Sequence, residues 1–595
     1  MVVERRLVYI LVPTYRMLRG VPVVHLYGIT DRGESVLAVD DRPRPYFFVP
    51  QRDVDAATRI ARPISAGVEP DLVDADGQPV ARLSFSDPRK VPDIREELLG
   101  AGIPFFEADV RYAYRYMIDH GIRGTTTIEG EAEPGRFTDL VFRRPEFSEG
   151  EFTPELRVLS IDIETGPRAE EIFSVALVGD GLDTVLIRSD RPVEGARALV
   201  DERTLLSETA QLIGQANPDV LTGWNFVDFD LVVLDRRAKE LGVPFRIGRG
   251  DGPIGFLDDP GFTRSKRAMV AGRQVLDGIQ LVRDAGETFE DFRLNTVASA
   301  VLGRAKLAEG SGRVEKIRRA FREDPEWLAR YNREDAVLVL DILEKTGALR
   351  LALERSLLTG MPLDRVGASV ATFDFLYLPE VRKAGRVAPT VGGDLRAGYV
   401  VGGTVLDSRA GIFGNVAVLD FKSLYPSIIL TFGIDPIAFA GAGEAEPGEL
   451  VSPNGARFRR AGGILPRVIT RLWERRDRAK AEGDAAMSMA AKLLMNSFYG
   501  VLGTNSCRFA SAAIANAITS FGGEILRRTK RLIEGLGHEV IYGDTDSVFV
   551  LTGAAGASQA REVGESIRDH VNRELTEWAR EEHGVESRLE LELEK

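Results

Sequence analysis

Two aspartates stand one residue apart in the apolar stretch VIYGDTDSVFV, at Asp544 and Asp546. The flanking residues are β-branched or aromatic, and the central Gly-Asp-Thr-Asp predicts a tight turn between the two strands of a hairpin. Because alternate side chains of a strand share a face, the two carboxylates are expected to lie on one small patch. For this pair alone, an ordinary hairpin whose acids face water is an equally good interpretation.

A second pair of acids, Asp162 and Glu164, lies in the strand-like run VLSIDIETG. Burying unpaired charges costs several kcal/mol each, so acids on a core strand are normally neutralised by a cation. Asp230 and Asp335 lie at the polar edges of other apolar patterns, and Tyr331 precedes Asp335 by one helical turn. Oxygen ligands suit Mg²⁺ or Mn²⁺, so this set predicts a two-cation site for phosphodiester hydrolysis. Asp230 taken alone fits a solvated loop residue equally well.

A further acid, Asp420, lies in VAVLDFKSLYPSIIL and is followed by Tyr425. In the helical pattern KLLMNSFYG, Lys492, Asn496 and Tyr499 are spaced at i, i+4 and i+7. This spacing places the three side chains on one face of a helix.

Periodicity indicates which elements position these residues. From LRVLSIDIET onward, strand-like runs alternate with helical patterns such as ERTLLSETAQLIGQA, which is typical of an α/β layer. Earlier, short β-rich runs such as VVHLYGIT predict a separate strand-rich module. Later, the pattern predicts a strand at VAVLDF, two long helices over 464–500 joined at AEGDAA, and a helix over 511–536. The sequence therefore predicts a mixed α/β protein of several domains.

Composition narrows the class of protein. A length of 595 residues predicts about four domains at ~150 residues each. The single cysteine, Cys507, excludes a disulfide within the chain and a cysteine-based zinc site, and it indicates a reducing, cytoplasmic location. No stretch reaches the ~18 apolar residues that cross a bilayer, so no membrane partner is expected. The net charge of −13 argues against nucleic-acid binding through overall charge, although local basic faces can still bind it.

The motifs resemble those of the B-family DNA polymerases. DFKSLYPS, KLLMNSFYG and YGDTDS are similar to polymerase motifs A, B and C, and DIET, NFVDFD and YNRED are similar to the three exonuclease motifs of the proofreading domain. Only eleven residues separate Lys480 from Lys492, which is similar to the short fingers of the bacterial polymerase II type. Two signatures depart from the family: the Tyr-x-Gly-Gly segment has Val400 before Val401, and Gly523 stands where an arginine is expected.

The resemblance implies a fold with a strand-rich N-terminal domain, a ribonuclease H-like exonuclease domain, a palm with an antiparallel sheet and short two-helix fingers. The implied segments are an N-terminal domain (1–150), the exonuclease domain (151–345), the first part of the palm with its preceding helices (346–460), the fingers (461–500) and the second part of the palm (501–595).

The resemblance also implies metal ligands and catalytic roles. Asp420 and Asp546 are expected to bind two Mg²⁺ ions for nucleotidyl transfer, and Asp544 belongs to the same patch with a less direct role. A second set of two Mg²⁺ ions is expected at the exonuclease site, and Mn²⁺ is an alternative metal at both sites. Its ligands are Asp162, Glu164, Asp230 and Asp335, and Tyr331 positions the attacking water.

Nucleotide and DNA contacts follow from the same motifs. RLWERRDRAK lies in a basic helical stretch, where residues 464–480 contain six Arg or Lys against two acids. Without the neighbouring motifs, this is most simply a solvated helix face. With them, the expected triphosphate-binding residues are Arg476, Lys480, Lys492 and Asn496, and Lys492 also counts as catalytic. Tyr425 is expected to exclude the ribose 2′-OH. The expected DNA-binding residues are Asn225, Phe229, Gly402, Gly403 and Tyr499.

The sequence thus predicts a DNA-directed DNA polymerase with 3′–5′ proofreading, acting in DNA repair or replication on primer-template DNA and dNTPs. The chain ends at LELELEK, where the family continues into a thumb, so a truncated or split chain is expected. A second polypeptide carrying the thumb and a sliding clamp are further candidate partners. The alternative is an exonuclease or structural subunit of a split polymerase with little polymerisation of its own.

Overall fold

The structure is a computed structural model that describes residues 2–258, 266–304, 312–392, 398–444 and 446–595. The chain forms two compact units, Met1–Arg44 with Arg111–Ala368 and Pro45–Val110 with Ser369–Lys595. The predicted N-terminal segment 1–150 therefore contributes to both units, and the predicted segment boundaries stay predictions. Within the described ranges, no helix is long and apolar enough to cross a membrane.

In the first unit, the N-terminal strands pair into a ring. The order β1-β2-β3-β8-β7 closes because β1 also pairs with β7, and β9 adds to β7. Closure pairs strand edges that would otherwise be open for association. The bounds are β1 (Val2–Leu18), β2 (Val21–Thr30), β3 (Ser35–Asp40), β7 (Thr125–Pro134), β8 (Leu140–Arg143) and β9 (Glu146–Ser148), with α3 (Tyr112–Asp119) beside them.

The second sheet of this unit has the order β13-β12-β11-β10-β14-β17. Its central strands are predominantly apolar, as expected of a sheet with helices on both faces. The bounds are β10 (Val158–Thr165), β11 (Ile172–Gly179), β12 (Leu182–Arg188), β13 (Arg197–Leu199), β14 (Val220–Gly223) and β17 (Gln274–Asp277). A separate two-stranded ribbon contains β15 (Gly255–Asp258) and β16 (Lys266–Met269).

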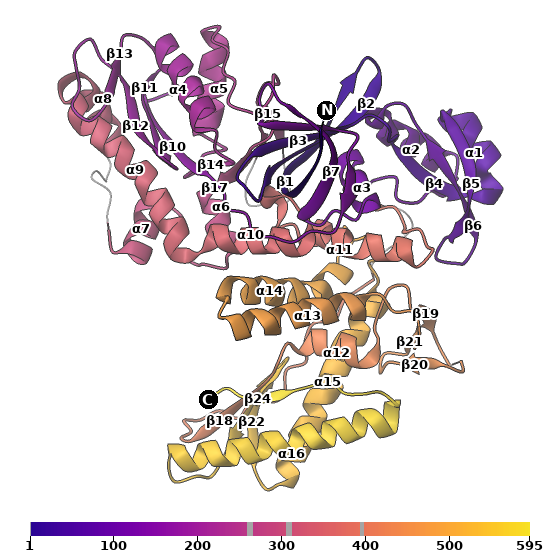
Figure 1. Cartoon of the computed structure of the whole chain (residues 1–595). Coiled ribbons are helices and arrows are strands. Elements are labelled where there is room, and N and C mark those ends of the chain that lie inside the picture. The colour runs from indigo at the N-terminus through magenta and orange to yellow at the C-terminus, as the bar shows by residue number, and fades with distance from the viewer. Residues whose placement is uncertain (1, 259–265, 305–311, 393–397, 445) are drawn as a thin grey trace. The chain divides into compact units, whose positions relative to one another are not determined.

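Helices cover both faces of the second sheet (Figure 1). On one face, α4 (Glu202–Ala216) and α5 (Asp230–Glu240) pack against a core that includes Ile161 and Ile163 of β10. On the other, α8 (Arg313–Glu323) and α9 (Pro325–Thr346) pack against Phe173 and Ala176 of β11. Because side chains alternate, Asp162 and Glu164 of β10 point toward the α9 face. The remaining helices are α6 (Gly278–Asp284), α7 (Leu294–Leu302), α10 (Ala348–Thr359) and the short η3 (Leu363–Arg365).

The second unit begins with a small module whose sheet has the order β4-β6-β5. Its own core includes Phe47, Ala81 and Leu83, and it is covered by two helices. The bounds are β4 (Tyr46–Pro50), η1 (Gln51–Asp53), α1 (Val54–Ala61), β5 (Ser65–Val73), β6 (Pro79–Ser84), η2 (Pro88–Lys90) and α2 (Val91–Gly100).

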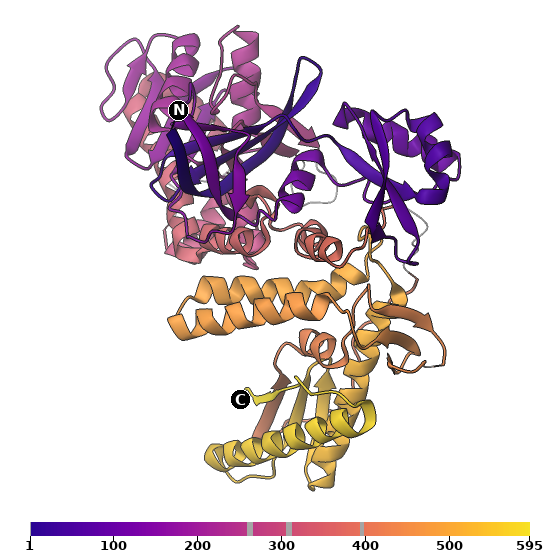
Figure 2. The ribbon, with the colours of Figure 1, turned by 45° about the vertical axis from the view of Figure 1, so that its right-hand side comes forward.

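The rest of the second unit is built on a four-stranded antiparallel sheet, β22-β23-β18-β24. In β18, Ala417, Leu419 and Phe421 are buried, so Asp420 points to the opposite face. The helices α15 and α16 pack against this sheet (Figure 2). The bounds are α11 (Ser369–Lys383), β18 (Val416–Phe421), α12 (Leu424–Phe432), α15 (Ala512–Gly535), β22 (Glu539–Asp544), β23 (Ser547–Leu551), α16 (Ala557–His583) and β24 (Leu591–Leu593).

Two helices of equal length, α13 (Leu465–Glu482) and α14 (Ala485–Leu502), form an antiparallel pair (Figure 2). Gly483 ends α13 in the left-handed conformation with φ 76°, and the Asp484 carboxylate caps α14 by accepting from the Met487 amide at 3.0 Å. The predicted helix pair over 464–500 is confirmed. A small sheet, β19 (Phe439–Ala442), β21 (Ala456–Arg459) and β20 (Glu449–Val451), lies between α12 and α13 in the sequence.

Candidate active sites

Three of the predicted carboxylates of the first unit meet at one point, which we call the β10 cluster: Asp162, Glu164 and Asp335. Each offers one oxygen, and these oxygens all lie within 4.8 Å of one another. Glu164 and Asp335 are buried and Asp162 is half-buried. An oxygen-only donor set at this spacing suits a hard divalent cation such as Mg²⁺.

Asp230, the fourth predicted ligand, lies next to the β10 cluster but outside that group of three. It is the first residue of α5, and its carboxylate accepts a hydrogen bond from the Ile163 amide at 3.0 Å. Burial, together with the charge of Asp162, raises the pKa of Asp230 well above its usual range. A bound cation would relieve this repulsion, so the residue fits a metal site.

Tyr331 lies on α9 one turn before Asp335 and is fully buried. Its ring stacks on Trp327, with centroids 5.1 Å apart and planes inclined by 14°. The stack restrains the ring of Tyr331. Its predicted role toward water stays a prediction.

Asn332 is a residue of this site that sequence reasoning missed. Its Nδ2 donates to Oδ2 of Asp162 at 2.7 Å, and its Oδ1 accepts from the Ser174 hydroxyl at 2.8 Å. The side chain has no exposed surface. The signal was available, because Asn332 precedes Asp335 by three residues on the same helix and so shares its face.

The loop between β14 and α5 carries the predicted single-strand contacts. Asn225 is exposed with φ 60°, and Phe229 is 40% exposed although it is aromatic. The Asp277 carboxylate, which sequence reasoning also missed, holds this loop by accepting from the Val227 amide at 3.2 Å. Burial raises the pKa of Asp277 to about 6. An exposed aromatic ring beside a carboxylate cluster is suited to stacking on a base.

In the second unit, Asp420, Asp544 and Asp546 form what we call the β18 cluster. β18 and β23 pair with Asp420 opposite Ser547, and the Phe421 amide donates to the Asp546 carbonyl at 2.8 Å. The predicted tight turn is present, with Thr545 at φ 53°. Within the described ranges these three acids do not form a close group like the β10 cluster.

Mutual repulsion nevertheless marks the β18 cluster. Burial, and then the charge of Asp546, raises the pKa of Asp420 to about 6. Burial, followed by the charge of Asp544 among other acids, also raises the pKa of Asp546, whereas Lys492 of α14 opposes both shifts. The Asp544 side chain accepts from the hydroxyl groups of Tyr542 and Thr545 at 3.3 and 3.0 Å, and its less direct role stays a prediction.

Glu594 is a further acid that sequence reasoning missed. It directly follows β24, which pairs with β18, and its charge contributes to the raised pKa of both Asp420 and Asp546. The alternating glutamates of LELELEK were the available signal, because an i, i+2 spacing on a strand places them on one face.

Of the two predicted glycines, Gly403 lies against the turn at Thr545. A Cβ at Gly403 would be 2.3 Å from Oγ1 of Thr545, and the Thr545 amide donates to the Thr404 carbonyl at 2.9 Å. Only glycine allows this close approach. Gly402 has open space around it, and the Tyr499 hydroxyl donates to the Val401 carbonyl at 3.1 Å.

Gly523 on α15 also has little room. A Cβ there would be 2.4 Å from Oγ1 of Thr404 and 3.2 Å from Nη1 of Arg527. The guanidinium of Arg527, one turn further along the helix, therefore reaches back toward the position where the family pattern has an arginine.

The basic residues of the helix pair fall into two groups. Lys480, Lys492 and Asn496 are exposed, whereas Arg476 is buried and donates from Nη1 to the Ser423 hydroxyl at 3.1 Å. Ser423 precedes α12, the helix that carries Tyr425. The rings of Tyr425 and Tyr499 lie with centroids 4.6 Å apart, and burial raises the pKa of Tyr425 to about 12.

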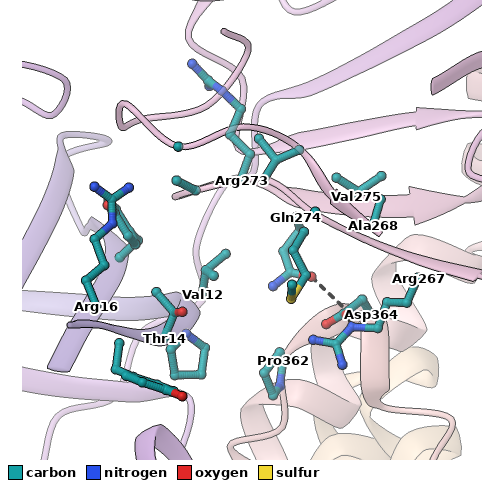
Figure 3. Close-up of a pocket in the computed structure, with 18 of the residues that line it drawn as sticks. Val12, Thr14, Arg16, Arg267, Ala268, Arg273, Gln274, Val275, Pro362 and Asp364 are labelled. Atoms are coloured by element: carbon teal, nitrogen blue, oxygen red, sulfur yellow. Dashed lines mark hydrogen bonds and ion pairs between the residues drawn. The ribbon is translucent and has the colours of Figure 1, made fainter. Parts of the chain in front are cut away.

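A cavity of about 200 Å³ lies in the first unit, and its lining contains no residue of the β10 cluster. Figure 3 shows Val12, Thr14 and Arg16 of β1 on one side and Gln274 and Asp364 on another. The Asp364 amide donates to Oε1 of Gln274 at 3.1 Å, and the Asp364 carboxylate pairs with Arg267. No predicted site residue lines this cavity.

Comparisons with known proteins agree with the motifs. The profile "DNA polymerase family B" matches residues 367–580, and "DNA polymerase family B, exonuclease domain" matches residues 103–297. DNA polymerase II of Escherichia coli is 38% identical over 541 residues, which cover 88% of this chain and 67% of that protein. A DNA polymerase of Archaeoglobus fulgidus is 28% identical over 592 residues, covering 94% and 72%.

A solved structure is similar along nearly the whole chain. The family B DNA polymerase of Pyrobaculum calidifontis superposes with a TM-score of 0.77 and 26% identity, covering 99% of this chain and 78% of that one. This likeness confirms the predicted mixed α/β fold with a strand-rich N-terminal domain, an exonuclease domain and a palm.

Proposed function

Since this chain belongs to DNA polymerase family B and is a DNA-directed DNA polymerase with 3′–5′ exonuclease activity, we propose a role for each of its two carboxylate clusters. The β18 cluster supports template-directed nucleotidyl transfer onto a primer 3′ hydroxyl. The β10 cluster supports proofreading. The observation that carries this division is that the two clusters belong to different compact units, each with its own aromatic and polar surroundings.

Asp420 and Asp546 would hold the Mg²⁺ ions of the synthesis site, with Asp544 and Glu594 adding negative charge beside them. The raised pKa of Asp420 and of Asp546 supports this fit, because carboxylates that repel one another are stabilised by a divalent cation. When bound, paired Mg²⁺ ions supply charge neutralisation at the attacking and leaving oxygens.

The side chains of the helix pair supply positive charge for the triphosphate. Lys480, Lys492 and Asn496 are exposed and can donate to phosphate oxygens, and Lys492 already acts on both metal-ligand carboxylates. Arg476 would exchange its bond to Ser423 for a phosphate. Tyr425 packs against Tyr499, so its ring is held in place to exclude a 2′-OH by shape.

Template and primer contacts are proposed for residues 401–404, which lie against the turn at Thr545. Gly403 allows the backbone to approach Thr545 closely, Gly402 leaves open space on the same segment, and Tyr499 holds the segment through the Val401 carbonyl. Backbone contacts of this kind position DNA without reading its sequence.

At the proofreading site, Asp162, Glu164 and Asp335 would hold Mg²⁺, with Asp230 completing the acidic set. Asn332 orients Asp162 through its amide. Tyr331 would position the attacking water, and Phe229 with Asn225 would hold the unpaired end of the primer. Both clusters would therefore use carboxylate oxygens as metal ligands, one to add nucleotides to the primer strand and the other to remove them.

Separation-of-function variants test this proposal. Asp546→Ala or Asp420→Ala should reduce nucleotide incorporation by at least about 100-fold and leave degradation of single strands intact, because each removes a ligand at one cluster only. Asp162→Ala with Glu164→Ala should do the reverse. Primer extension and single-strand degradation, measured on the same preparations, give both readouts.

Loss of both activities from Asp546→Ala, in a protein that stays folded, would contradict the two-cluster proposal. An unmodified chain that degrades single strands but adds no nucleotide would instead favour the alternative, an exonuclease or structural subunit. A role in repair or replication, a sliding-clamp partner and a cytoplasmic location stay predictions that no contact of the described residues addresses.

A further inference from the structure

Asp435 is a fully buried carboxylate that the proposed chemistry does not use. Five donors converge on it, namely the Tyr377 hydroxyl at 2.9 Å and the amides of Ile437 (2.8 Å), Ala438 (2.9 Å), Ile464 (2.9 Å) and Leu465 (2.6 Å). A carboxylate can accept about four hydrogen bonds, so this one is saturated. Such a group has no capacity left to bind a ligand, and its role must lie in the elements that it joins.

The carboxylate of Asp435 caps α13 from outside the helix. Leu465 is the first residue of α13 and Ile464 precedes it, and Ile464 makes no side-chain capping bond of its own. The first amides of a helix lack partners within it, and the positive end of the helix dipole favours a negative charge there. Asp435 supplies both the acceptor and the charge, and the Tyr377 hydroxyl of α11 donates a further hydrogen bond to the same carboxylate.

Two contacts join α13 to the ends of α12, one at each end of α13. Asp435 lies in the turn just after α12 and binds the start of α13, whereas Arg476, near the end of α13, binds Ser423 just before α12. The two helices therefore run in opposite directions and are fastened at two points. If Arg476 turns to a triphosphate, its bond to Ser423 is lost and only the Asp435 attachment remains.

We propose that Asp435 is a positioning residue that fixes the start of α13, so that Arg476 and Lys480 meet the triphosphate at a set distance from Tyr425. The proposal rests on the proposed function of those two basic residues. It requires nothing of Asp435 beyond its five hydrogen bonds, and it treats the Arg476 end of the helix as the part that exchanges partners.

The test compares Asp435→Asn with the unmodified full chain. The amide retains the size of the side chain but removes its charge and presents hydrogens to amides that are themselves donors. We expect hydrogen exchange in residues 464–470 to accelerate about tenfold, and the KM for dNTP to rise about tenfold with kcat within about twofold. Degradation of single strands should not change, because the β10 cluster lies in the other unit.

Tyr377→Phe is the matched control. It removes one donor and leaves all four amide bonds to Asp435, so both readouts should stay within about twofold of the unmodified chain. Where Asp435→Asn fails to fold, Asp435→Ser replaces it, since the short hydroxyl cannot reach both helix amides. The same rise in exchange and KM is then expected.

Two outcomes overturn the proposal. One is an unchanged KM despite faster exchange at 464–470, and the other is unchanged exchange at 464–470, which would show that Asp435 does not fix the start of α13. A parallel loss of kcat and exonuclease activity indicates loss of folded protein, and the comparison is then made with Asp435→Ser. Arg476→Ala and Lys480→Ala separate failure of the positioning role from that of the proposed function. If they raise the KM while Asp435→Asn does not, only the positioning role fails. If neither does, triphosphate binding by α13 fails as well.

Discussion

Asp420 is a proposed metal ligand whose protonation affects both folding and metal binding. It is half-buried, and its pKa is raised to about 6 by burial and then by Asp546. An unfolded aspartate has a pKa of about 3.9. The folded protein therefore binds this proton more tightly than the unfolded chain does, and deprotonation of Asp420 works against folding unless a cation is present.

The pH dependence of stability follows from that sign. The stability that a protonated Asp420 contributes is present below about pH 4 and is lost as the pH rises through about 6. Mg²⁺ compensates for this loss only where the carboxylate is ionised. We therefore expect Mg²⁺ to raise the melting temperature more at pH 7.5 than at pH 5, as measured by differential scanning fluorimetry.

The control for this prediction is Asp420→Asn, which removes the titrating group and should shrink the difference between the two pH values. An equal Mg²⁺ shift at pH 5 and pH 7.5 in the unmodified chain would show that Asp420 does not control metal binding.

Tyr425 offers a second test at the scale of one side chain. If its ring excludes the 2′-OH by shape, Tyr425→Val should raise ribonucleotide incorporation about 10- to 100-fold relative to deoxynucleotide incorporation. Tyr425→Phe keeps the ring and should retain the discrimination. Competition between rNTP and dNTP in primer extension measures the ratio. A large effect of Tyr425→Phe would point to hydrogen bonding by the hydroxyl instead.

Among the elements, α9 contributes most to the proofreading site. It supplies Asp335, the stacked Tyr331 and the orienting Asn332 to the strand that carries Asp162. Partners that orient metal ligands typically affect activity or metal affinity by about 10- to 100-fold. Asn332→Ala should therefore lower single-strand degradation by about that factor and leave nucleotide incorporation unchanged.

Ser174→Ala is the matched control for Asn332. It removes the hydroxyl that donates to Asn332 but leaves the bond to Asp162 intact, so a smaller effect is expected. Degradation rates on one labelled oligonucleotide compare the two variants. If the rate with Asn332→Ala matches that of the unmodified chain, Asp162 does not need its partner.

Elements whose signals are local were predictable from the sequence. The strand VAVLDF is β18 at Val416–Phe421, and ERTLLSETAQLIGQA is α4 at Glu202–Ala216, because apolar periodicity and the Asp201 cap lie within the segment itself. The hairpin at Asp544 was predictable for the same reason. Its neighbours were not, because the strand β24 and the segment around Gly403 join it from distant parts of the chain.

The candidate sites show the same limit. Asp162, Glu164 and Asp335 could be grouped because each lies on a readable strand or helix. Asp230 was grouped with them, yet its oxygens lie outside the close set, since its position depends on how α5 meets the end of the sheet. Asp277 acts through a loop amide 50 residues away, and no local pattern encodes such a contact.

At the scale of the whole molecule, Arg508 joins segments of the second unit that are far apart in sequence. It is 2% exposed, and its guanidinium donates to the carboxylates of Asp109 and Asp374 at 2.8–3.1 Å. Asp109 lies near the end of the early segment, Pro45–Val110, whereas Asp374 lies on α11. The buried guanidinium of Arg508 therefore joins the early and late parts of this unit.

Removing that cation should destabilise the second unit selectively. Breaking a buried ion pair by deleting one partner costs about 3–5 kcal/mol, so Arg508→Met should lower the stability of this unit by roughly that amount. Lys530→Met, which removes a surface pair with Glu534, should cost no more than about 0.5 kcal/mol. Urea unfolding, followed by hydrogen exchange in peptides of each unit, would measure the loss of stability of each unit in both variants. Equal losses in both units would contradict this account.

The order in which the chain alternates between its units has a consequence for synthesis on the ribosome. Residues 45–110 emerge early, but Val387, which covers Phe48, Leu72 and Val80, is translated only after the whole of Arg111–Ala368. At about 5–20 residues per second, the wait is roughly 10–50 s. During that interval the nascent module displays an uncovered apolar face and an uncompensated Asp109, which makes it a natural client for chaperones that bind chains before their release.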